Sequence, residues 1–165
     1  MVYSAAIHDD NPELQAARAR GIKAVERSVM LGYISRTHAQ SIGVAGTHGK
    51  TTTTSMCTHI FLAAQRDPTV MIGGVLPALG AGHRVGKGDT IILESCEYCN
   101  SFLSFFPTVA VILNVDADHL DFFKDLEDVK RSFRRFAELV PETGFVVADR
   151  DDANTMDALR GIERK

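Results

Sequence analysis

The fold of this chain is decided by the stretch Ile42-Gly43-Val44-Ala45-Gly46-Thr47-His48-Gly49-Lys50-Thr51-Thr52-Thr53-Thr54. A short apolar run opens into glycines and ends in Gly-Lys-Thr before an amphipathic helical pattern, which is typical of a phosphate-binding loop. Gly46 and Gly49 allow the backbone to turn tightly, so that successive N–H groups and the helix N-terminus can surround a polyphosphate. The sequence therefore predicts a strand, a phosphate-binding loop and a helix in succession.

Two side chains of this loop carry predicted roles. Lys50 can reach the β- and γ-phosphates of a nucleotide, and the Thr51 hydroxyl suits a magnesium ion. The general pattern G-x-x-x-x-G-K-[ST] requires glycine at position 44, where this chain has Val44, so the loop is of a variant type. The alternative is a glycine-rich turn with an incidental lysine, but the coincidence of strand, Gly-Lys-Thr and helix favours phosphate binding.

Composition places the chain among ordinary globular proteins. It has 165 residues, of which 45% are hydrophobic and 24% are charged, enough for one domain with a full core. The net charge of -3 comes from mixed signs and gives no broad basic surface. We therefore expect neither nucleic acid nor a membrane as a partner, whereas a nucleotide bound by one loop remains compatible with this charge.

Cysteine usage bears on compartment and metal binding. The chain has three cysteines, Cys57, Cys96 and Cys99, an odd number with no secretory leader, and no apolar run long enough to cross a bilayer. We expect a cytoplasmic protein with reduced thiols. Cys96 and Cys99 have the spacing C-x-x-C, but a zinc site requires a second pair of ligands, so zinc is the less favoured reading.

The first forty residues predict a short β-α-β-α unit. Residues 2–7 and 22–25 form candidate strands, and Asn11-Pro12-Glu13 offers an N-cap, a first-turn proline and a first-turn acid for a helix that Gly21 closes. A second helical run places Val29, Met30, Leu31 and Ile34 on an apolar side. The unit is too short to fold alone, so we interpret it as the end of a nucleotide-binding α/β domain, linked onward by residues 36–41.

Beyond the loop, the pattern alternates helices with strands. A helix is expected over residues 51–66, packed on a sheet through Met56, Ile60, Phe61 and Ala64. Residues 69–72 form a candidate strand, and the glycine-rich segment 73–89 is expected to be a loop with a short hairpin near Arg84 and Val85.

Two aliphatic runs, 90–93 and 108–113, are expected to be central parallel strands covered on both faces. A helix over 126–140, with Val129, Phe133, Phe136 and Val140 inward, precedes a strand at 145–148 and a final helical stretch. In open α/β sheets, ligands bind beyond the carboxyl ends of the strands. Glu94 and the segment after Asn114 should therefore converge on the phosphate-binding loop.

Polar residues gather after both of these strands. A lone carboxylate at Glu94 is costly unless a cation meets it, and magnesium on a bound nucleotide supplies one; a solvated strand-end acid is the alternative. Glu97 is a weaker candidate. Residues 114–121 read Asn-Val-Asp-Ala-Asp-His-Leu-Asp, and the carboxylates around His119 could orient its ring as a metal ligand. His48 either faces a substrate anion or is a solvent-exposed loop residue.

Three ordered motifs resemble those of the Mur ligases. They are Gly46-Thr47-His48-Gly49-Lys50-Thr51-Thr52-Thr53-Thr54, Glu94-Ser-Cys-Glu97-Tyr-Cys-Asn-Ser-Phe102-Leu103 and Asn114-Val-Asp-Ala-Asp118-His119-Leu-Asp121. The start, residues 2–14, also resembles the end of the UDP-binding domain of that family. The resemblance covers nearly the whole chain and is strongest to the members that act on UDP-N-acetylmuramate and L-alanine.

The resemblance implies an α/β fold. Residues 41–165 would be the N-terminal part of a parallel-sheet P-loop ATPase domain of Mur ligase type, and residues 1–40 the C-terminal part of a Rossmann-like UDP-binding domain. It also implies ATP and Mg²⁺ as cofactors, UDP-N-acetylmuramate and L-alanine as substrates, and amide formation through an acyl phosphate in peptidoglycan precursor synthesis.

The same resemblance assigns residues by position. The implied catalytic residues are Lys50, Glu94 and His119, of which Lys50 stabilises the transferred phosphoryl group. Thr51 and Glu94 would hold one magnesium ion and His119 a second, supported by Asn114. The implied nucleotide-binding residues are Gly46, Thr47, His48, Gly49, Lys50, Thr51, Thr52 and Asn114.

Members of this family are about three domains long, so the chain is expected to be a fragment that is inactive alone. One alternative is another ligase of the superfamily, of the muramyl tripeptide, folylpolyglutamate or cyanophycin type; His48 and Cys96-Glu97-Tyr98 favour the alanine-adding type. The other alternative, from a different class, is a non-catalytic nucleotide-binding module.

Overall fold

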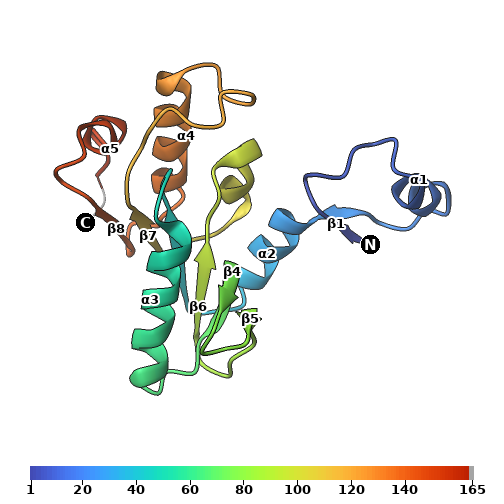
Figure 1. Cartoon of the computed structure of the whole chain (residues 1–165), viewed down its shortest axis with the longest axis horizontal. Coiled ribbons are helices and arrows are strands. Elements are labelled where there is room, and N and C mark those ends of the chain that lie inside the picture. The colour runs from blue at the N-terminus through green and yellow to red at the C-terminus, as the bar shows by residue number, and fades with distance from the viewer. Residues whose placement is uncertain (164–165) are drawn as a thin grey trace.

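The computed structural model describes residues 1–163 of the chain. Figure 1 shows two parts of unequal size, a sheet with helices on both faces and a small N-terminal region that projects from it. We call residues 1–26 the N-terminal arm and residues 40–163 the sheet unit. The helix α2 (Arg27–Ser35) joins them.

The N-terminal arm contains two strands and a helix. Strand β1 (Val2–Tyr3) pairs in parallel with β2 (Val25–Glu26), and α1 (Pro12–Ala19) crosses between them. The predicted helix start is confirmed, because the Asn11 side chain accepts hydrogen bonds from the N–H groups of Glu13 and Leu14 at 3.0 and 3.1 Å.

Both strands of the arm are shorter than predicted. The predicted strand 2–7 ends at Tyr3 because a turn follows, in which the Ile7 N–H bonds to the Ser4 carbonyl at 2.9 Å. The predicted strand 22–25 begins only at Val25, because the Ile22 N–H bonds to the Ala17 carbonyl at 2.9 Å and so completes the end of α1. Local backbone bonds thus take the groups that a longer ladder needs.

Helix α2 packs on a 3-10 segment, η1 (Tyr98–Ser104), of the sheet unit. A Cβ at Gly32 would lie 2.0 Å from the Ser104 carbonyl oxygen, so glycine is required for this approach. Of the predicted apolar side, Leu31 is buried, whereas Val29 and Ile34 are exposed. The helix therefore uses a narrower contact face than its sequence pattern suggests.

The sheet unit is built on six strands in the order β5-β4-β6-β3-β7-β8. In chain order these are β3 (Gln40–Ala45), β4 (Thr69–Leu76), β5 (Ala81–Arg84), β6 (Thr90–Glu94), β7 (Val109–Ile112) and β8 (Phe145–Ala148). All neighbours pair in parallel except β4 and β5, which form an antiparallel hairpin at one edge. The predicted parallel sheet is confirmed, with the loop-bearing strand β3 between β6 and β7.

The glycine-rich segment is more ordered than predicted. Strand β4 does not stop at Ile72 but continues through Gly73 and Gly74 to Leu76, and its pairing with β5 shifts register between Met71 and Leu76. A hairpin is present, but its turn lies at residues 77–80, and Arg84 ends its second strand instead of lying near the turn. The two glycines let the strand continue past Glu94, since a Cβ at Gly73 would lie 2.6 Å from Glu94 Oε1.

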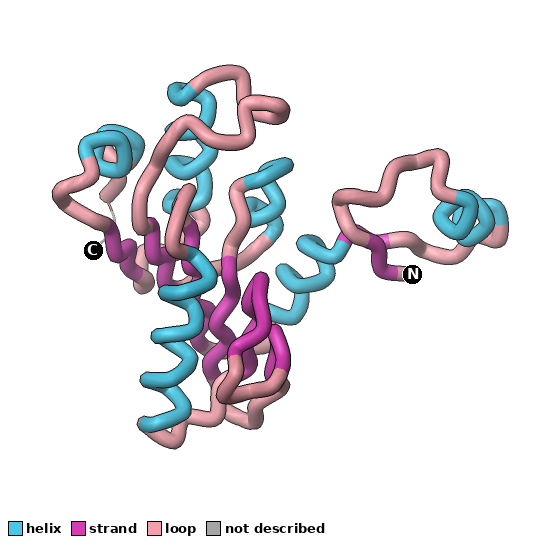
Figure 2. Tube along the Cα trace, viewed as in Figure 1, coloured by secondary structure: helices cyan, strands magenta, loops and turns pink. Residues whose placement is uncertain are grey.

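Helices cover both faces of the sheet, as Figure 2 shows in outline, and buried residues of the central strands belong to two different apolar clusters. On one face lies α3 (Lys50–Ala63), with Cys57 and Phe61 packed on Ile42 and Ile92. On the other face lie η1, α4 (Leu126–Glu138) and α5 (Ala153–Ala158), over the larger apolar cluster. This double cover explains why β6 and β7 read as continuous aliphatic runs.

The predicted buried face of α3 is largely wrong. Met56 and Ile60 are 58% and 64% exposed, whereas Thr54 and Thr58 are fully buried; of the predicted residues, only Phe61 packs on the sheet. The threonine hydroxyls donate to the carbonyls four residues earlier, Lys50 O and Thr54 O, each at 2.8 Å. Because these polar groups are satisfied inside the helix, they can face the sheet.

The predicted face of α4 is confirmed. Val129, Phe133, Phe136 and Val140 are all buried, and the Phe136 ring stacks on Phe102 with centroids 4.6 Å apart. Asp125 caps the helix by accepting a hydrogen bond from the Asp128 N–H at 2.9 Å. Among residues 1–163, no helix is long and apolar enough to span a membrane.

Candidate functional site

The phosphate-binding loop lies between β3 and α3, at the carboxyl end of the central strand. Gly46 has φ 147° and Gly49, the N-cap of α3, has φ 84°, both in the region that favours glycine. A Cβ at Gly46 would lie 2.9 Å from Leu113 Cβ, so this glycine also allows the loop to approach β7. Residues 47–52 line a surface pocket of about 300 Å³.

The loop is fastened to the segment after β7. The Asn114 side chain accepts from the His48 N–H at 2.7 Å and donates to the His48 carbonyl at 3.1 Å. The Thr47 hydroxyl accepts from the Asp116 N–H at 2.8 Å. Asn114 therefore fixes the backbone of the loop, while the exposed His48 side chain stays beside the pocket.

Lys50 lies with its ammonium turned into the loop. Its Nζ donates to the carbonyls of Gly46 at 2.6 Å and Thr47 at 3.1 Å, and to Glu97 Oε1 at 3.2 Å. Only 13% of its side chain is exposed. The positive charge is thus held within the loop by two backbone carbonyls and the Glu97 carboxylate.

Thr51 and Glu94 meet as the sequence predicts. The Thr51 hydroxyl donates to Glu94 Oε1 at 2.9 Å, and Glu94 Oε2 accepts from the Gly73 N–H at 2.7 Å. A hydroxyl and a carboxylate oxygen beside a phosphate-binding loop are the hard oxygen donors that Mg²⁺ prefers, so these two residues fit the expected ion.

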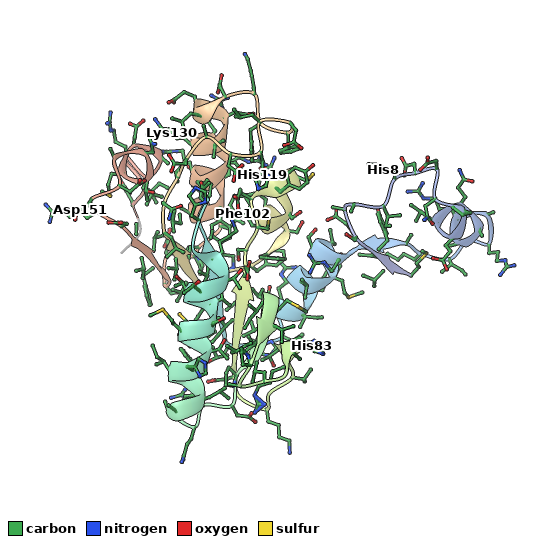
Figure 3. The ribbon with its side chains drawn as sticks, in the orientation of Figure 1. His8, His83, Phe102, His119, Lys130 and Asp151 are labelled. Atoms are coloured by element: carbon green, nitrogen blue, oxygen red, sulfur yellow. The ribbon has the colours of Figure 1, made fainter. Side chains whose placement is uncertain are left out.

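His119 lies on the loop after β7, near η1, as Figure 3 shows. Its Nε2 is 3.8 Å from Glu97 Oε1, and its ring is tilted against the Tyr98 ring with centroids 4.8 Å apart. Its backbone has φ 52°, a strained value for a histidine, and its N–H donates to Asp118 Oδ1 at 2.7 Å. His8 in the arm and His83 on β5 lie in other parts of the molecule.

Tyr98 is tied to the same loop by its hydroxyl, which donates to Asp121 Oδ2 at 3.0 Å. The hydrogen bond to the Asp121 carboxylate, together with its negative charge, raises the pKa of Tyr98. The Tyr98 ring also meets Phe122 edge to face, with centroids 6.0 Å apart. An aromatic cluster therefore borders His119.

Glu97 makes more contacts at the candidate site than the sequence suggests. It is 1% exposed, and it contacts both Lys50 and His119. Its burial comes from the path of η1, which turns through left-handed conformations at Cys99 and Asn100, with φ 53° and 55°. In the sequence, the only signal for Glu97 was a second acid three residues after Glu94. The turn itself could not be predicted, because Cys99 and Asn100 are not glycines.

The residues of the candidate site thus form two pairs. Thr51 and Glu94 make one, and Glu97 and His119 make the other, with Lys50 bonded to Glu97. Within residues 1–163, no group of three histidines, cysteines or acids could hold a metal ion on its own. The cysteines are free thiols, and burial raises the pKa of Cys96 above its usual range. Any cation here would need further oxygen ligands, from water or from a bound molecule.

Comparison with known families covers almost the whole chain. The Mur ligase middle domain matches residues 44–164, and the description "Mur ligase family, catalytic domain" matches residues 1–39. The chain is 53% identical over 164 residues to UDP-N-acetylmuramate–L-alanine ligase of Caldanaerobacter subterraneus subsp. tengcongensis, which covers 99% of this chain and 36% of the relative. It is 49% identical to the ligase of the same name from Acetivibrio thermocellus, covering 98% of this chain and 34% of that relative.

Solved structures give the same picture. UDP-N-acetylmuramate-alanine ligase of Thermotoga maritima superposes with a TM-score of 0.84 at 28% identity, covering 95% of this chain and 36% of that one. A tripeptide ligase, UDP-N-acetylmuramate:L-alanyl-gamma-D-glutamyl-meso-diaminopimelate ligase of Neisseria meningitides, gives 0.85 at 26%, covering 96% and 54%. This chain spans about 36% of the length of the curated relatives that it matches.

Proposed function

Because this chain belongs to the Mur ligase family, we propose that it carries the phosphate and metal half of an ATP-dependent amide ligase. In the whole protein, that ligase joins L-alanine to UDP-N-acetylmuramate in the cytoplasm, as a step of peptidoglycan precursor synthesis. The observation that carries the proposal is the meeting of the Gly46–Thr51 loop, with Lys50 inside it, and the Thr51–Glu94 pair at one edge of the sheet.

We further propose that the two parts of the chain belong to two domains. Residues 1–40 are the end of the domain that binds the UDP-linked substrate, and residues 41–165 are the first part of the ATP-binding domain. The separation of the N-terminal arm from the sheet unit in Figure 1 supports this division. Residues 1–26 contribute to none of the three apolar clusters of residues 1–163, whereas Leu31 of the joining helix α2 belongs to the largest of them.

The proposed roles follow from charge. A carboxylate substrate and ATP repel each other, so positive groups must neutralise both before the carboxylate attacks the γ-phosphate. The loop N–H groups and Lys50 would bind the β- and γ-phosphates, with Asn114 holding the loop backbone in place. Thr51 and Glu94 would hold Mg²⁺, which supplies charge neutralisation of the phosphates, and His119 would hold a second ion.

The acid substrate would approach from the side of α2. A cavity of about 90 Å³ lies there, and Arg27 and Ser28 from α2 line it together with Glu94. An arginine that lines the same cavity as the predicted metal ligand suits a carboxylate-bearing substrate. The joining helix α2 thus brings the substrate-binding part of the protein to the nucleotide site.

The test is phosphate release from MgATP in the presence of UDP-N-acetylmuramate, with and without L-alanine. We expect alanine-dependent release by a protein that contains these residues within the full length of the relatives. The 165 residues alone should bind MgATP weakly and should give no such turnover, because orientation and water exclusion by the remaining parts contribute several powers of ten in rate. Alanine-dependent turnover by the 165 residues would contradict this division of labour.

A second candidate is a ligase that adds a tripeptide instead of L-alanine, since the tripeptide ligase of Neisseria meningitides superposes as well as the alanine ligase does. The 53% identity to an L-alanine ligase favours the first candidate. The same assay, with L-alanyl-γ-D-glutamyl-meso-diaminopimelate in place of L-alanine, decides between them.

A further inference from the structure

The Glu97 carboxylate lies between two side chains that reach the site from different elements. Lys50 begins α3, and its Nζ is 3.2 Å from Glu97 Oε1 and 3.0 Å from Oε2. His119 lies on the loop after β7, with Nε2 3.8 Å from Oε1. The two functional side chains thus share one carboxylate.

Burial makes this arrangement consequential. The Glu97 side chain is 2% exposed and the Lys50 side chain 13%, so water can compensate neither charge well. Removing one partner of a buried ion pair leaves the other charge without compensation. Among residues 1–163, no other acid contacts Lys50 Nζ. Glu97 Oε2 lies 3.0 Å from Lys50 Nζ, but within the same residues it accepts no well-directed hydrogen bond. Each group therefore depends on the other.

The neighbouring carboxylate has different partners. Glu94 accepts from the Thr51 hydroxyl and from the Gly73 N–H, and it makes no ion pair with Lys50. Glu94 and Glu97, three residues apart, therefore contact different groups. Glu94 faces the proposed first ion, and Glu97 faces the phosphate lysine and the histidine.

We propose that Glu97 is a positioning residue, which holds Lys50 Nζ against the carbonyls of Gly46 and Thr47 and orients the His119 ring through its Nε2 atom. The role of the two positioned residues rests on the proposed function, but their placement does not. The buried Glu97 carboxylate thereby fixes the positions of Lys50 and His119 before a nucleotide binds.

The test measures how fast the lysine amines of the 165-residue chain are reductively methylated, residue by residue, by mass spectrometry. Lys130 on α4 is the internal control, because its side chain is also 13% exposed but pairs with Glu127 and Asp157. The exposed Lys87 sets the fast limit. In the wild type, we expect Lys50 and Lys130 to react at least about tenfold more slowly than Lys87.

The variants are Glu97→Gln, which removes the charge and keeps the shape, Glu97→Ala, and the matched change Glu94→Gln. We expect Lys50 to react at least about fivefold faster in Glu97→Gln, and faster still in Glu97→Ala, with Lys130 unchanged. Glu94→Gln should leave Lys50 protected. Protection of Lys50 in both Glu97 variants would overturn the proposal, as would an equal gain at Lys130, which reports general unfolding.

Two further readouts separate positioning from a merely structural role. In carbon-proton spectra of the imidazole rings, Glu97→Gln should move the His119 signal and leave the other five histidines in place, whereas Glu94→Gln should not move it. The loss of MgATP affinity caused by Glu97→Ala should be at least about threefold smaller in a Lys50→Met background than in the wild type, because the two residues act together. An unmoved His119 signal or additive effects would contradict the proposal.

These outcomes distinguish the inference from the proposed function. Methylation and the histidine spectra are recorded without nucleotide, so they test the placement of Lys50 and His119 even in a chain that binds no ATP. A chain that shows the expected protection but no MgATP binding refutes the proposed function alone. A chain that binds MgATP but shows no dependence of Lys50 on Glu97 refutes the inference alone.

Discussion

The N-terminal arm and the sheet unit obey the same local rules but differ in what holds them together. In the arm, Leu14 and Ala17 are the buried apolar residues, and the two strands have two residues each. In the sheet unit, the central strands are covered on both faces, and the largest apolar cluster has 15 residues, of which only Leu31 of α2 lies outside the unit. Helix caps and turns can shape a segment, but a functional site needs a packed scaffold behind it.

The two parts also differ in how exposed their ion pairs are to water. The ion pair of the arm, Arg18 with Asp9 at 2.9 Å, has side chains 47% and 87% exposed, so water screens it. The sheet unit also has exposed pairs, such as Arg66 with Asp89, but at its candidate site the pair of Lys50 with Glu97, 3.0 Å apart, is almost fully buried. Only the second kind of pair fixes side chains in a defined geometry.

The largest expected effect comes from the core of the sheet unit. Phe136→Ala removes a fully buried ring that stacks on Phe102, so the free energy of unfolding should fall by about 3–5 kcal/mol. Urea unfolding followed by far-UV circular dichroism measures it. A loss below about 1 kcal/mol would mean that the sheet unit is not held by this cluster.

Next is the charge of the phosphate-binding loop. Lys50→Ala should weaken MgATP binding by at least about tenfold, because it removes the cation that we propose binds the phosphates, and charge-assisted hydrogen bonds contribute about 1.5–3 kcal/mol each. Lys87→Ala removes an equal charge from an exposed loop and should have no measurable effect. Calorimetric titration compares the two, and equal losses would show that only net charge matters.

Helix capping gives a smaller effect. Asp125→Ala removes the acceptor for the Asp128 N–H at the start of α4 and should cost about 1 kcal/mol. The equivalent change in the arm, Asn11→Ala, removes the cap of α1 but should leave the main unfolding transition in place. Thermal melts of both variants test this contrast, and a large shift from Asn11→Ala would contradict it.

The pH dependence of the sheet unit should be smaller again. Burial raises the pKa of Asp152, but hydrogen bonds from Thr155 and Val115 outweigh it and leave the pKa below its usual value. A lowered pKa contributes stability above the pKa of the unfolded state, about 3.9, and this stability is lost as pH falls through the lower folded value. The contribution should be under about 1 kcal/mol, and Asp152→Asn should remove it from a melting series between pH 5 and pH 2.

The smallest effect on the sheet unit should come from the arm. Leu14→Ala opens the core of the arm, so amide protection in α1 should disappear, while the unfolding free energy of the sheet unit changes by less than about 0.5 kcal/mol. Hydrogen exchange of both regions in one sample measures this. Loss of protection in β3 and β6 would show that the two parts fold together.

Sequence patterns predicted what local chemistry determines. The loop glycines, the cap at Asn11, the inward face of α4 and the parallel strands follow from residue types at fixed spacing. The buried face of α3 did not, because threonines that satisfy their own hydroxyls can replace Met56 and Ile60 at the sheet. Hydropathy alone does not register this internal bonding.

The candidate site shows the same limit. The approach of Thr51 to Glu94 could be predicted, since both follow parallel neighbouring strands whose ends share one edge of the sheet. The sharing of Glu97 between Lys50 and His119 could not, because it depends on left-handed residues at Cys99 and Asn100 and on the strained His119 backbone. Such long-range placement is set by packing rather than by local pattern.

The most direct test of the central claim is a map of backbone amide shifts as a magnesium complex of a non-hydrolysable ATP analogue is added to the 165-residue chain. We predict saturable shifts that are largest at Gly49, Lys50 and Thr51 and smaller near Glu94 and His119, and that vanish when magnesium is chelated. Shifts confined to the N-terminal arm, or no saturable shifts at the loop, would contradict the account.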